Sequence, residues 1–428
     1  MDRRNCIRNL TLLSGGIVFS QSFFGQTSLI QKKRKTILLC TGIQYANMGD
    51  HGHVTGILNL LTMYLPEARI VLWPKIDLPE FDELISANWP DVRIIHSKLA
   101  DGKPVDEEIG KVAKQVDFVI GGHGEETEVS WVAKNFNKPY GIFGVTVGAP
   151  PEGTRKEFID SASFYFTRET ASLENLKKAG VRCPVTDFVP DATFGSNVQD
   201  EQKSSVFMRK NELKYKKFLC VVPRLRVTPY YRIAPELRYD PSPWSDERVR
   251  EVDQLNNKHK EEDHAKARAA MIAWVRQTGY PVLLCPEMIH NMDIFDELLL
   301  NPLPDDVKKN VIKKEHFWRI DEATTVYKNA TAVISLECHS PIIAYTQGTP
   351  AFYLRQPEDT IKGQMYYDIG LPKWVFEIEK ATGSDVAIRL MDLINDHQTA
   401  TSRLSFAMNY VREKQKEAMM KIRKTMGL

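Results

Sequence analysis

Short apolar runs alternate with amphipathic segments along the first half of the chain. Thr36–Cys40 and residues 117–122 have the length and apolar composition of buried strands, whereas residues 53–64 and 169–179 have the pattern of helices. Strands that alternate with helices at this rhythm are typical of a parallel, doubly wound sheet. We therefore predict an α/β lobe over residues 36–200.

A second series of strands and helices follows the polar segment at residues 196–217. It includes the apolar run FLCVVP and a long amphipathic segment at residues 261–278, which predicts a second α/β lobe over residues 205–380. Residues 226–248 are rich in proline and aromatic side chains and show no clear period, which favours a functional loop or an insertion. Residues 384–428 are expected to form two helices. Two successive Rossmann-like lobes with a C-terminal helical tail predict a GT-B-like α/β architecture, with a cleft between the lobes.

Residues 334–350, ISLECHSPIIAYTQGTP, combine a strand, a polar turn and a helix within the second lobe. Pro341 stands where a helix begins, and Gly348 stands where it ends. In βαβ units, ligands bind at the carboxyl ends of strands, beside helix N-termini. Glu337 and His339 occupy that position and are candidate functional residues. From spacing alone, an equally good interpretation is that His339 merely caps the helix.

Composition restricts the class of function. Of the 428 residues, 43% are hydrophobic and 26% are charged, which is typical of a soluble globular protein. The net charge of +2 argues against a dedicated nucleic-acid surface. No Cys-x-x-Cys or Cys/His ligand spacing is present, so neither a metal site nor a cofactor is expected. The six cysteines lie far apart, at positions 6, 40, 183, 220, 285 and 338.

The N-terminal segment, residues 1–30, resembles an export signal. Arg3 and Arg4 form a twin-arginine pattern, and an apolar run follows at residues 10–24. That run is too short and too rich in Gly and Ser for a membrane span. We therefore expect a periplasmic or otherwise exported protein without a stable membrane span. The alternative is an ordinary basic tail on a cytoplasmic protein.

Two Gly-containing turns follow predicted strands of the first lobe. Backbone amides in such turns can face an anion, and glycine lets the backbone approach a ligand closely. A Gly-rich turn without a ligand is about as common, so each turn alone is a weak signal. The candidate anion-binding residues are Asn47, Gly49 and Asp50 in the first turn, and Gly121, Gly122 and Gly124 in the second.

The order of motifs along the chain resembles the polysaccharide pyruvyl transferase family. In the first half, N-x-G-D, D-x-V-I-G-G-x-G and F-x-V-T-V-G follow predicted strands. R-E-x-x-S-L-x-x-L then begins at Arg168, and D-A-T-F begins at Asp191. The second half contributes PRLR from Pro223, the segment PVLLCPE, and the turn around His339. The resemblance extends over about residues 37–371, and the order and spacing of the motifs carry it.

The resemblance implies a transferase that moves the enolpyruvyl unit of phosphoenolpyruvate onto a sugar diol of a cell-surface or secreted glycan. The products are a cyclic pyruvate ketal and phosphate. By position, Arg224 or Arg226 matches the family's donor-binding arginine, and the arginine fork suits phosphate and carboxylate groups. His339 matches the catalytic histidine, and a histidine suits proton donation because its pKa lies near neutrality.

The sequence departs from the family pattern at the turn that precedes His339. The family's arginine is replaced by Glu337, and its leucine by Cys338. A charge about 4 Å from a donor anion is worth roughly 4 kcal/mol at an effective dielectric of ~20. Reversal of that charge therefore requires another cation, with Arg226, Arg232 and Arg238 as candidates, or a donor other than phosphoenolpyruvate. A further interpretation is that Glu337 orients the imidazole of His339 and raises its pKa.

Two alternative functions remain open. Export would separate the enzyme from phosphoenolpyruvate, a cytosolic metabolite, and this favours an exported, non-catalytic, glycan-binding member of the family. The aromatic side chains Tyr230, Tyr231, Tyr239 and Trp244 of the irregular segment would then be candidates for stacking on sugars, although local packing is the commoner role of such residues. The other alternative is a GT-B-like glycosyltransferase that uses a nucleotide sugar, because the fold alone does not determine function.

Overall fold

The computed structural model describes residues 34–100, 102–122, 126–238 and 240–428. The predicted export segment, Gly124 and Tyr239 lie outside these described residues. Residues 34–428 form one compact unit that contains two parallel sheets. Within the described residues, we find no helix with both the length and the apolar character needed to cross a bilayer.

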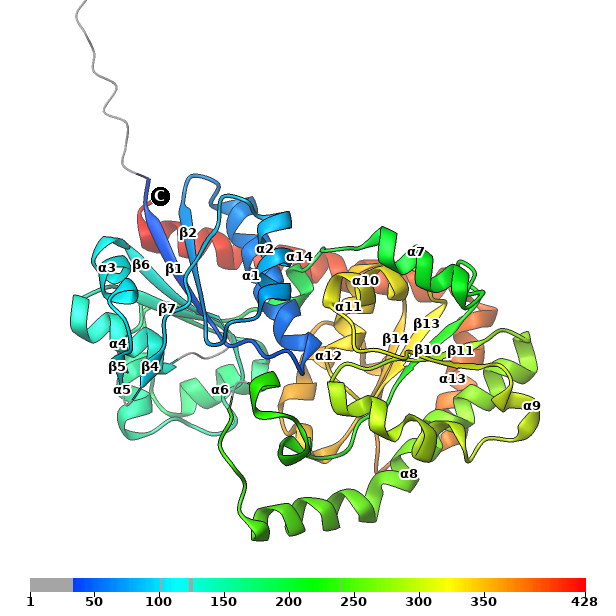
Figure 1. The fold of residues 1–428 in the computed structure, drawn as a ribbon. Coiled ribbons are helices and arrows are strands. Elements are labelled where there is room, and N and C mark those ends of the chain that lie inside the picture. Colours follow the sequence, from blue (N-terminus) through cyan, green and yellow to red (C-terminus); the bar gives the residue numbers. More distant parts are fainter. Residues whose placement is uncertain (1–33, 101, 123–125, 239) are drawn as a thin grey trace, which may run out of the picture. The chain divides into compact units, whose positions relative to one another are not determined.

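The first sheet has seven strands in the order β3-β2-β1-β6-β7-β8-β9. The central strand β1 pairs in parallel with both β2 and β6, and these strands lie side by side in the blue and cyan part of the ribbon (Figure 1). Five of the six residues of β1 are buried, as expected for a parallel sheet that is covered on both faces. The strands are β1 (Thr36–Thr41), β2 (Arg69–Pro74), β3 (Arg93–Ile94), β6 (Phe118–Gly122), β7 (Tyr140–Val145), β8 (Phe164–Thr167) and β9 (Thr186–Phe188).

Helices connect these strands, and a small hairpin precedes the third helix. The helices are α1 (Met48–Tyr64), α2 (Pro79–Asn88), α3 (Glu108–Gln115), α4 (Glu126–Phe136), α5 (Gly153–Ser161) and α6 (Thr170–Lys178); the hairpin pairs β4 (Leu99–Ala100) with β5 (Lys103–Pro104), and the 3₁₀ turn η1 (Ala192–Gly195) follows β9.

Helix α1 begins at Met48, five residues before the start predicted from the apolar pattern. The Asn47 side chain caps this helix by accepting a hydrogen bond from the Gly49 N–H at 2.9 Å. The first turns contain the polar residues Asp50, His51 and His53, all of which are buried. The prediction placed polar residues in solvent, and it therefore missed a helix that begins with buried polar residues.

The second sheet has six parallel strands in the order β12-β11-β10-β13-β14-β15. All four residues of β13 are buried, in agreement with the strand predicted before the polar turn. The strands are β10 (Leu219–Val222), β11 (Val282–Leu284), β12 (Val311–Lys313), β13 (Ala332–Ser335), β14 (Ala351–Arg355) and β15 (Val375–Glu377). The two parallel sheets confirm the prediction of two Rossmann-like lobes.

Helix α8 is the longest helix of the second lobe and begins 15 residues before the amphipathic segment by which it was predicted. Its first half is polar on nearly all sides, so the apolar pattern identified only the half that packs against the sheet. The irregular segment at residues 226–248 forms only two 3₁₀ turns, η2 (Tyr230–Arg232) and η3 (Pro235–Leu237), before α8 begins. The other elements are α7 (Glu201–Lys210), α8 (Asp246–Thr278), η4 (Ile289–Ile294), the π-helix η5 (Phe295–Leu300), α9 (Asp305–Lys308), α10 (Ile320–Asn329), α11 (Ser340–Thr346), η6 (Pro357–Asp359), η7 (Lys362–Gln364), α12 (Met365–Asp368) and η8 (Pro372–Trp374).

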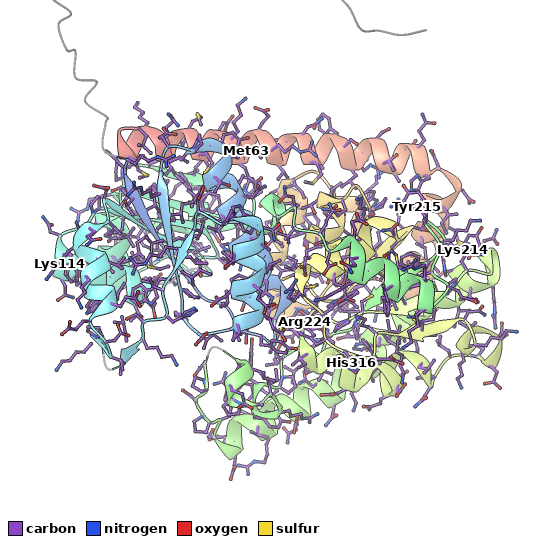
Figure 2. All side chains as sticks on the ribbon, turned by 45° about the horizontal axis from the view of Figure 1, so that its top comes forward. Met63, Lys114, Lys214, Tyr215, Arg224 and His316 are labelled. Atoms are coloured by element: carbon purple, nitrogen blue, oxygen red, sulfur yellow. The ribbon has the colours of Figure 1, made fainter. Side chains whose placement is uncertain are left out.

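The C-terminal tail forms two helices, as predicted, namely α13 (Gly383–Asn395) and α14 (His397–Met426). Helix α13 packs against α8, whereas α14 contacts both α1 of the first lobe and α11 of the second. Figure 2 shows α14 as the long red helix that runs past both lobes. The tail therefore fastens the two lobes together.

The loop after β1 joins the first lobe to the second by backbone hydrogen bonds. The Met48 N–H donates to the Glu287 carbonyl at 2.9 Å, and the Ile289 N–H donates to the Ala46 carbonyl at 2.9 Å. The Ala46 N–H donates to the Leu237 carbonyl at 2.8 Å, which adds the irregular segment to the same junction. These bonds hold the N-terminus of α1 against the ends of the second-lobe strands.

Candidate active site

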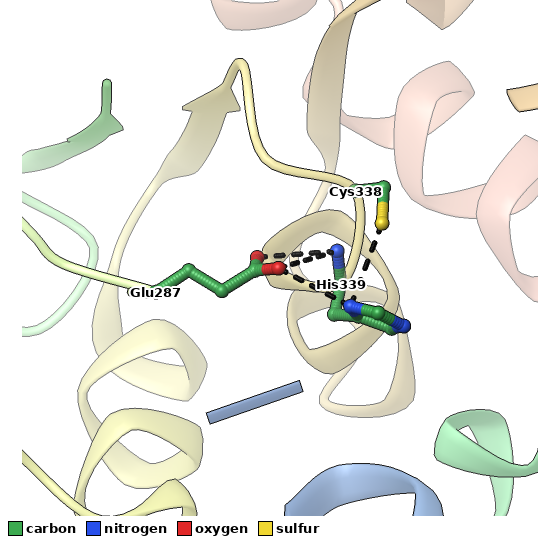
Figure 3. Close-up of side chains that lie close together, drawn as sticks. All are labelled: Glu287, Cys338 and His339. Carbon is green, nitrogen blue, oxygen red and sulfur yellow. Dashed lines mark hydrogen bonds and ion pairs between the residues drawn. The ribbon is translucent and has the colours of Figure 1, made fainter. Parts of the chain in front are cut away.

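His339 lies in the turn between β13 and α11, at the carboxyl end of a central strand of the second sheet. Its ring is buried, with 3% of its surface exposed. The side chain of Glu287, which follows β11, approaches it from the neighbouring part of the sheet (Figure 3). One carboxylate oxygen of Glu287 lies 3.2 Å from Nδ1 of His339. The strand order brings these two residues together across 52 positions of sequence.

The Glu287 carboxylate also accepts backbone hydrogen bonds from the start of α11. The N–H of His339 donates at 3.1 to 3.2 Å, and the N–H of Ser340 donates at 2.5 Å. Burial alone would raise the pKa of Glu287, but the hydrogen bonds from His339 and Ser340 hold this pKa below its usual value. Glu287 is therefore an anion that both caps the helix and orients the imidazole.

His339 is held in its protonated form. Burial alone would lower its pKa, but the adjacent Cys338 and the Glu287 carboxylate raise this pKa to about 10. The Cys338 sulfur lies 3.4 Å from Nδ1. Nε2 makes no hydrogen bond to the described residues and lies 4.0 Å from a carboxylate oxygen of Asp191. Because Glu287 occupies Nδ1, Nε2 carries the proton that can be transferred.

The first predicted glycine turn meets His339 directly. A Cβ atom added to Gly49 would lie 2.3 Å from Nδ1 of His339, so only glycine allows this approach. The Asn47 amide donates to Asp50 at 2.8 Å. Burial raises the pKa of Asp50 to about 6, while the positive charges of His339 and Lys362 oppose the shift. The structure thus places Asn47, Gly49 and Asp50 beside His339.

The second predicted glycine turn has a different environment. Gly121 and Gly122 end the central strand β6, where they pair with β1 and β7. An added Cβ at Gly122 would meet the side chain of Thr41 at 3.4 Å. These contacts place both glycines within the sheet, and their proposed role in binding a donor stays a prediction.

A buried ion pair from the first lobe faces His339. Arg168 donates to the Asp191 carboxylate at 2.8 Å and lies 3.2 Å from Glu169. Burial alone would raise the pKa of Asp191, but Arg168 and the nearby histidines hold it well below its usual value. Both residues belong to motifs that carried the family resemblance, R-E-x-x-S-L and D-A-T-F. Sequence reasoning used these motifs to identify the family but did not assign their residues to the site.

Glu337 contacts an arginine rather than His339. Its carboxylate lies 3.2 Å from Nε of Arg224, and it accepts a hydrogen bond from the Asn291 amide at 3.2 Å. No hydrogen bond or ion pair joins Glu337 to His339 among the interactions of the described residues, so the interpretation that Glu337 orients the imidazole is wrong. Glu287 makes that contact from the segment that follows β11, where it meets the start of α11. Burial raises the pKa of Glu337 to about 7, although Arg224 opposes this shift.

Arg224 and Arg226 both follow the end of β10, but they have different partners. Arg224 pairs with Glu337 and Asp359 at the edge of the His339 cluster and is labelled in Figure 2. The buried Arg226 instead donates to both carboxylate oxygens of Asp263, at 2.9 and 3.1 Å. It also pairs with Glu379 at 2.9 Å. Arg226 is therefore held within a separate acidic cluster.

The other two arginines considered as replacement cations are also engaged. Arg232 pairs with Asp253 at 3.0 Å, and Arg238 donates to the backbone carbonyls of Tyr230 and Pro241. Lys362, in the turn η7 after β14, is a cation near His339 that was not predicted from the sequence. Burial alone would lower the pKa of Lys362, but the adjacent Cys338 raises it, so the ammonium group is charged. No motif in the sequence indicated this lysine.

The aromatic residues of the irregular segment pack on one another. The ring of Trp244 lies 5.7 Å from that of Tyr231 and 6.4 Å from that of Tyr230. The guanidinium of Arg248 lies 4.0 Å from the centre of the Trp244 ring. These contacts support local packing for the aromatic residues that were considered for sugar stacking.

Glu287, Cys338 and His339 form the buried group whose donor atoms could hold a metal ion. One donor atom of each lies within 4.8 Å of the others. A carboxylate, a thiolate and an imidazole are all zinc ligands. In the structure the three side chains are linked to one another instead, since Nδ1 of His339 contacts both Glu287 and Cys338 (Figure 3).

The geometry suits acid–base chemistry on an anionic substrate. His339 is a buried acid with a positioned proton on Nε2, and Asp50 is a carboxylate whose pKa lies near neutrality. Lys362 and Arg168 supply positive charge around the same point. The prediction of a functional histidine at the end of β13 gains a physical basis, while its catalytic role remains to be tested.

Comparison with known proteins adds a family and a fold. The family model described as polysaccharide pyruvyl transferase matches residues 47–356. No curated protein matches the sequence. Three similar solved structures are the Anabaena protein Alr3699/HepE in complex with UDP-glucose, a glycosyltransferase from Rickettsia africae, and the UDP-GlcNAc 2-epimerase from Neisseria meningitidis bound to UDP-GlcNAc.

These structures share the fold at low sequence identity. The TM-scores are 0.55, 0.56 and 0.52, in the same order, with identities of 11%, 10% and 10%. The alignments cover 90%, 92% and 91% of this chain and 98%, 97% and 100% of the other chains. The likeness confirms the predicted GT-B-like architecture of two α/β lobes.

Proposed function

The chain belongs to the polysaccharide pyruvyl transferase family, and on this premise we propose that it transfers a pyruvyl group from phosphoenolpyruvate to a sugar diol of a cell-surface or secreted glycan. The observation that carries the proposal is the buried pair of His339 and Glu287, joined at 3.2 Å. It provides a proton donor at the position where the family pattern requires one.

In the proposed reaction, Nε2 of His339 donates its proton to the methylene carbon of phosphoenolpyruvate. The adjacent carbon becomes electrophilic, and one sugar hydroxyl attacks it while Asp50 accepts the hydroxyl proton. The bond between that carbon and the bridging phosphate oxygen then breaks. The second sugar hydroxyl attacks the same carbon and closes the ketal ring. Of the two hydroxyl protons, one returns to His339 and the other leaves with phosphate. An acid and a base with separated pKa values allow both transfers near neutral pH.

The charged groups of the donor require cations despite the presence of Glu337. Lys362 lies close enough to both His339 and Arg168 to interact electrostatically, and Arg168 pairs with the Asp191 that faces His339. We assign the donor phosphate and carboxylate to these two cations. Glu337 is partly protonated near neutral pH because its pKa is about 7. The cost of the reversed charge is therefore much smaller than a fully ionised carboxylate would impose.

The test is a reaction of the purified protein with phosphoenolpyruvate and a panel of glycan acceptors. Released phosphate is measured together with the mass of the ketal product. The wild-type protein should form both products, whereas His339→Gln, once shown to be folded, should form neither. Full activity of His339→Gln would contradict the assignment. UDP-glucose serves as a control donor, because its turnover would indicate a glycosyltransferase instead.

A specific observation favours the second candidate, an exported glycan-binding protein without catalytic activity. Arg224, the expected donor-binding arginine, is already neutralised by Glu337 and Asp359. Cell fractionation with sequencing of the mature N-terminus discriminates between the two candidates. A cytoplasmic protein has access to phosphoenolpyruvate, whereas a periplasmic protein with a cleaved N-terminus does not. Glycan binding without phosphate release would support the second candidate.

A further inference from the structure

A pocket of about 560 Å³ lies where α1, α2 and the loop before α10 meet. Its walls come from residues 45–51 and 78–83 of the first lobe and from residues 317–322 of the second. Along the first turn of α1, Gly49 faces His339, whereas His51 faces this pocket and packs against Phe81 at 5.0 Å between ring centres. The pocket and the His339 cluster therefore lie on different sides of α1, and the two are distinct.

Aromatic rings form much of the pocket wall. Tyr45 and Phe317, one from each lobe, approach to 5.6 Å between ring centres. Phe81 and Trp318 contribute two further rings that are largely buried. The volume falls within the range of about 300–1,000 Å³ that is typical of small-molecule sites. The face of a sugar ring, which carries C–H groups, suits such walls.

His51 lines the pocket and carries a buried hydrogen-bond acceptor that has no partner among the described residues. The side chain is 4% exposed, and burial lowers its pKa to about 4, so the ring is neutral at pH 7. Nε2 lies 3.0 Å from the Gln44 carbonyl, which can only accept, so Nε2 carries the hydrogen. Nδ1 is then an acceptor and has no hydrogen-bond partner among the described residues. A buried acceptor of this kind selects a ligand that donates, such as a hydroxyl group.

The charges at the pocket disfavour an anion. Four carboxylates line it, from Glu80, Glu83, Asp321 and Glu322, against two cations, from Lys203 and Arg319. Arg319 is turned toward Asp321, to which it donates at 2.6 and 3.1 Å. The exposed glutamates instead offer acceptors to hydroxyl or ammonium groups. Phosphoenolpyruvate, phosphate and uronic acids would meet unfavourable electrostatics here.

We infer that this pocket binds a neutral or amino sugar unit of the acceptor glycan. The aromatic rings contact the sugar face, Nδ1 of His51 accepts a hydroxyl hydrogen bond, and the glutamates accept further hydroxyl or ammonium hydrogens. Because α1 lies between the pocket and His339, this unit is a neighbour of the modified sugar rather than that sugar itself. That the sugar belongs to an acceptor rests on the proposed function, whereas the sugar chemistry rests on the pocket alone.

The test is isothermal titration of the full chain with neutral, amino and acidic trisaccharides, namely cellotriose, glucosamine trimers and galacturonate trimers. Cellotriose or the glucosamine trimer should bind at least about tenfold more tightly than the galacturonate trimer. Phe317→Ala and His51→Leu should each weaken that binding about tenfold, which is the scale of a lost contact or hydrogen bond. His316→Ala is the matched control. His316 precedes Phe317 in the same loop, and its side chain is exposed and does not line the pocket (Figure 2).

The outcomes separate this inference from the proposed function. His339→Gln should bind the trisaccharide as the wild type does, because the pocket does not contain His339. If sugar binding depends on Phe317 but no ketal forms, the inference of a sugar-binding pocket stands and the proposed transferase function fails. No binding of the three trisaccharides, strongest binding of the acidic one, or wild-type affinity in Phe317→Ala would overturn the inference. Phe317 is only partly buried, so this variant is informative even if His51→Leu fails to fold.

Discussion

Replacement of Glu287 by Gln tests how the fold controls the proton of His339. The substitution keeps an oxygen that can accept from the start of α11, but it removes the negative charge 3.2 Å from Nδ1. At an effective dielectric of ~20, a charge pair at that distance is worth about 5 kcal/mol, or roughly 4 pKa units as an upper bound. The pKa of His339, about 10 in the wild type, should therefore fall, although the adjacent Cys338, which also raises it, remains.

The consequence is a narrower pH profile. In the wild type, kcat/KM should rise as Asp50 loses its proton near pH 6 and fall as His339 loses its proton near pH 10. In Glu287→Gln the falling limb should move to lower pH by up to about four units on the scale of that ~5 kcal/mol interaction, because the imidazolium loses the carboxylate that stabilises its charge.

Two measurements check the prediction, namely phosphate release across pH 5–11 and an NMR titration of the His339 ring. Glu377→Gln is the matched control, since it removes a carboxylate that pairs with Arg355 at 2.8 Å and makes no contact with His339. A His339 pKa that stays within one unit of the wild-type value in Glu287→Gln would refute the reasoning. So would a shift of equal size in the control.

Three further substitutions test other parts of the site. Gly49→Ala should reduce kcat by at least about tenfold in phosphate-release assays, because the new methyl group would occupy the position of the His339 ring; unchanged kcat would contradict the packing. Glu337→Gln should lower the Kd for phosphoenolpyruvate several-fold above pH 7, where the wild-type carboxylate is charged, and have little effect at pH 5.5, as measured by calorimetry. Arg226→Ala should lower the free energy of unfolding by about 3–5 kcal/mol, because it leaves the buried Asp263 without its partner, while donor affinity stays near the wild-type value. Lost donor affinity with unchanged stability would instead restore Arg226 to the donor site.

The periodic pattern of the sequence was sufficient to predict the architecture. Apolar runs such as the one that became β13 identify buried parallel strands, because each such strand is covered on both faces. The start of α1 and the first half of α8 were missed for opposite reasons. The start of α1 is polar although it is buried, so it looks like a loop in the sequence. The first half of α8 is polar because it is exposed, so it lacks the apolar repeat by which helices are recognised.

The sequence by itself also determined where His339 lies, because a strand, a polar turn and a proline place it at the carboxyl end of a sheet. It could not determine which carboxylate faces the ring. Glu337 is two residues away along the chain, yet its side chain pairs with Arg224, whereas Glu287 reaches His339 from another strand. Only the order of β11, β10 and β13 in the folded sheet decides this, because that order sets which strand ends converge. The carboxylate nearest to His339 in sequence and the one nearest to it in space thus differ, and the second one contacts the imidazole.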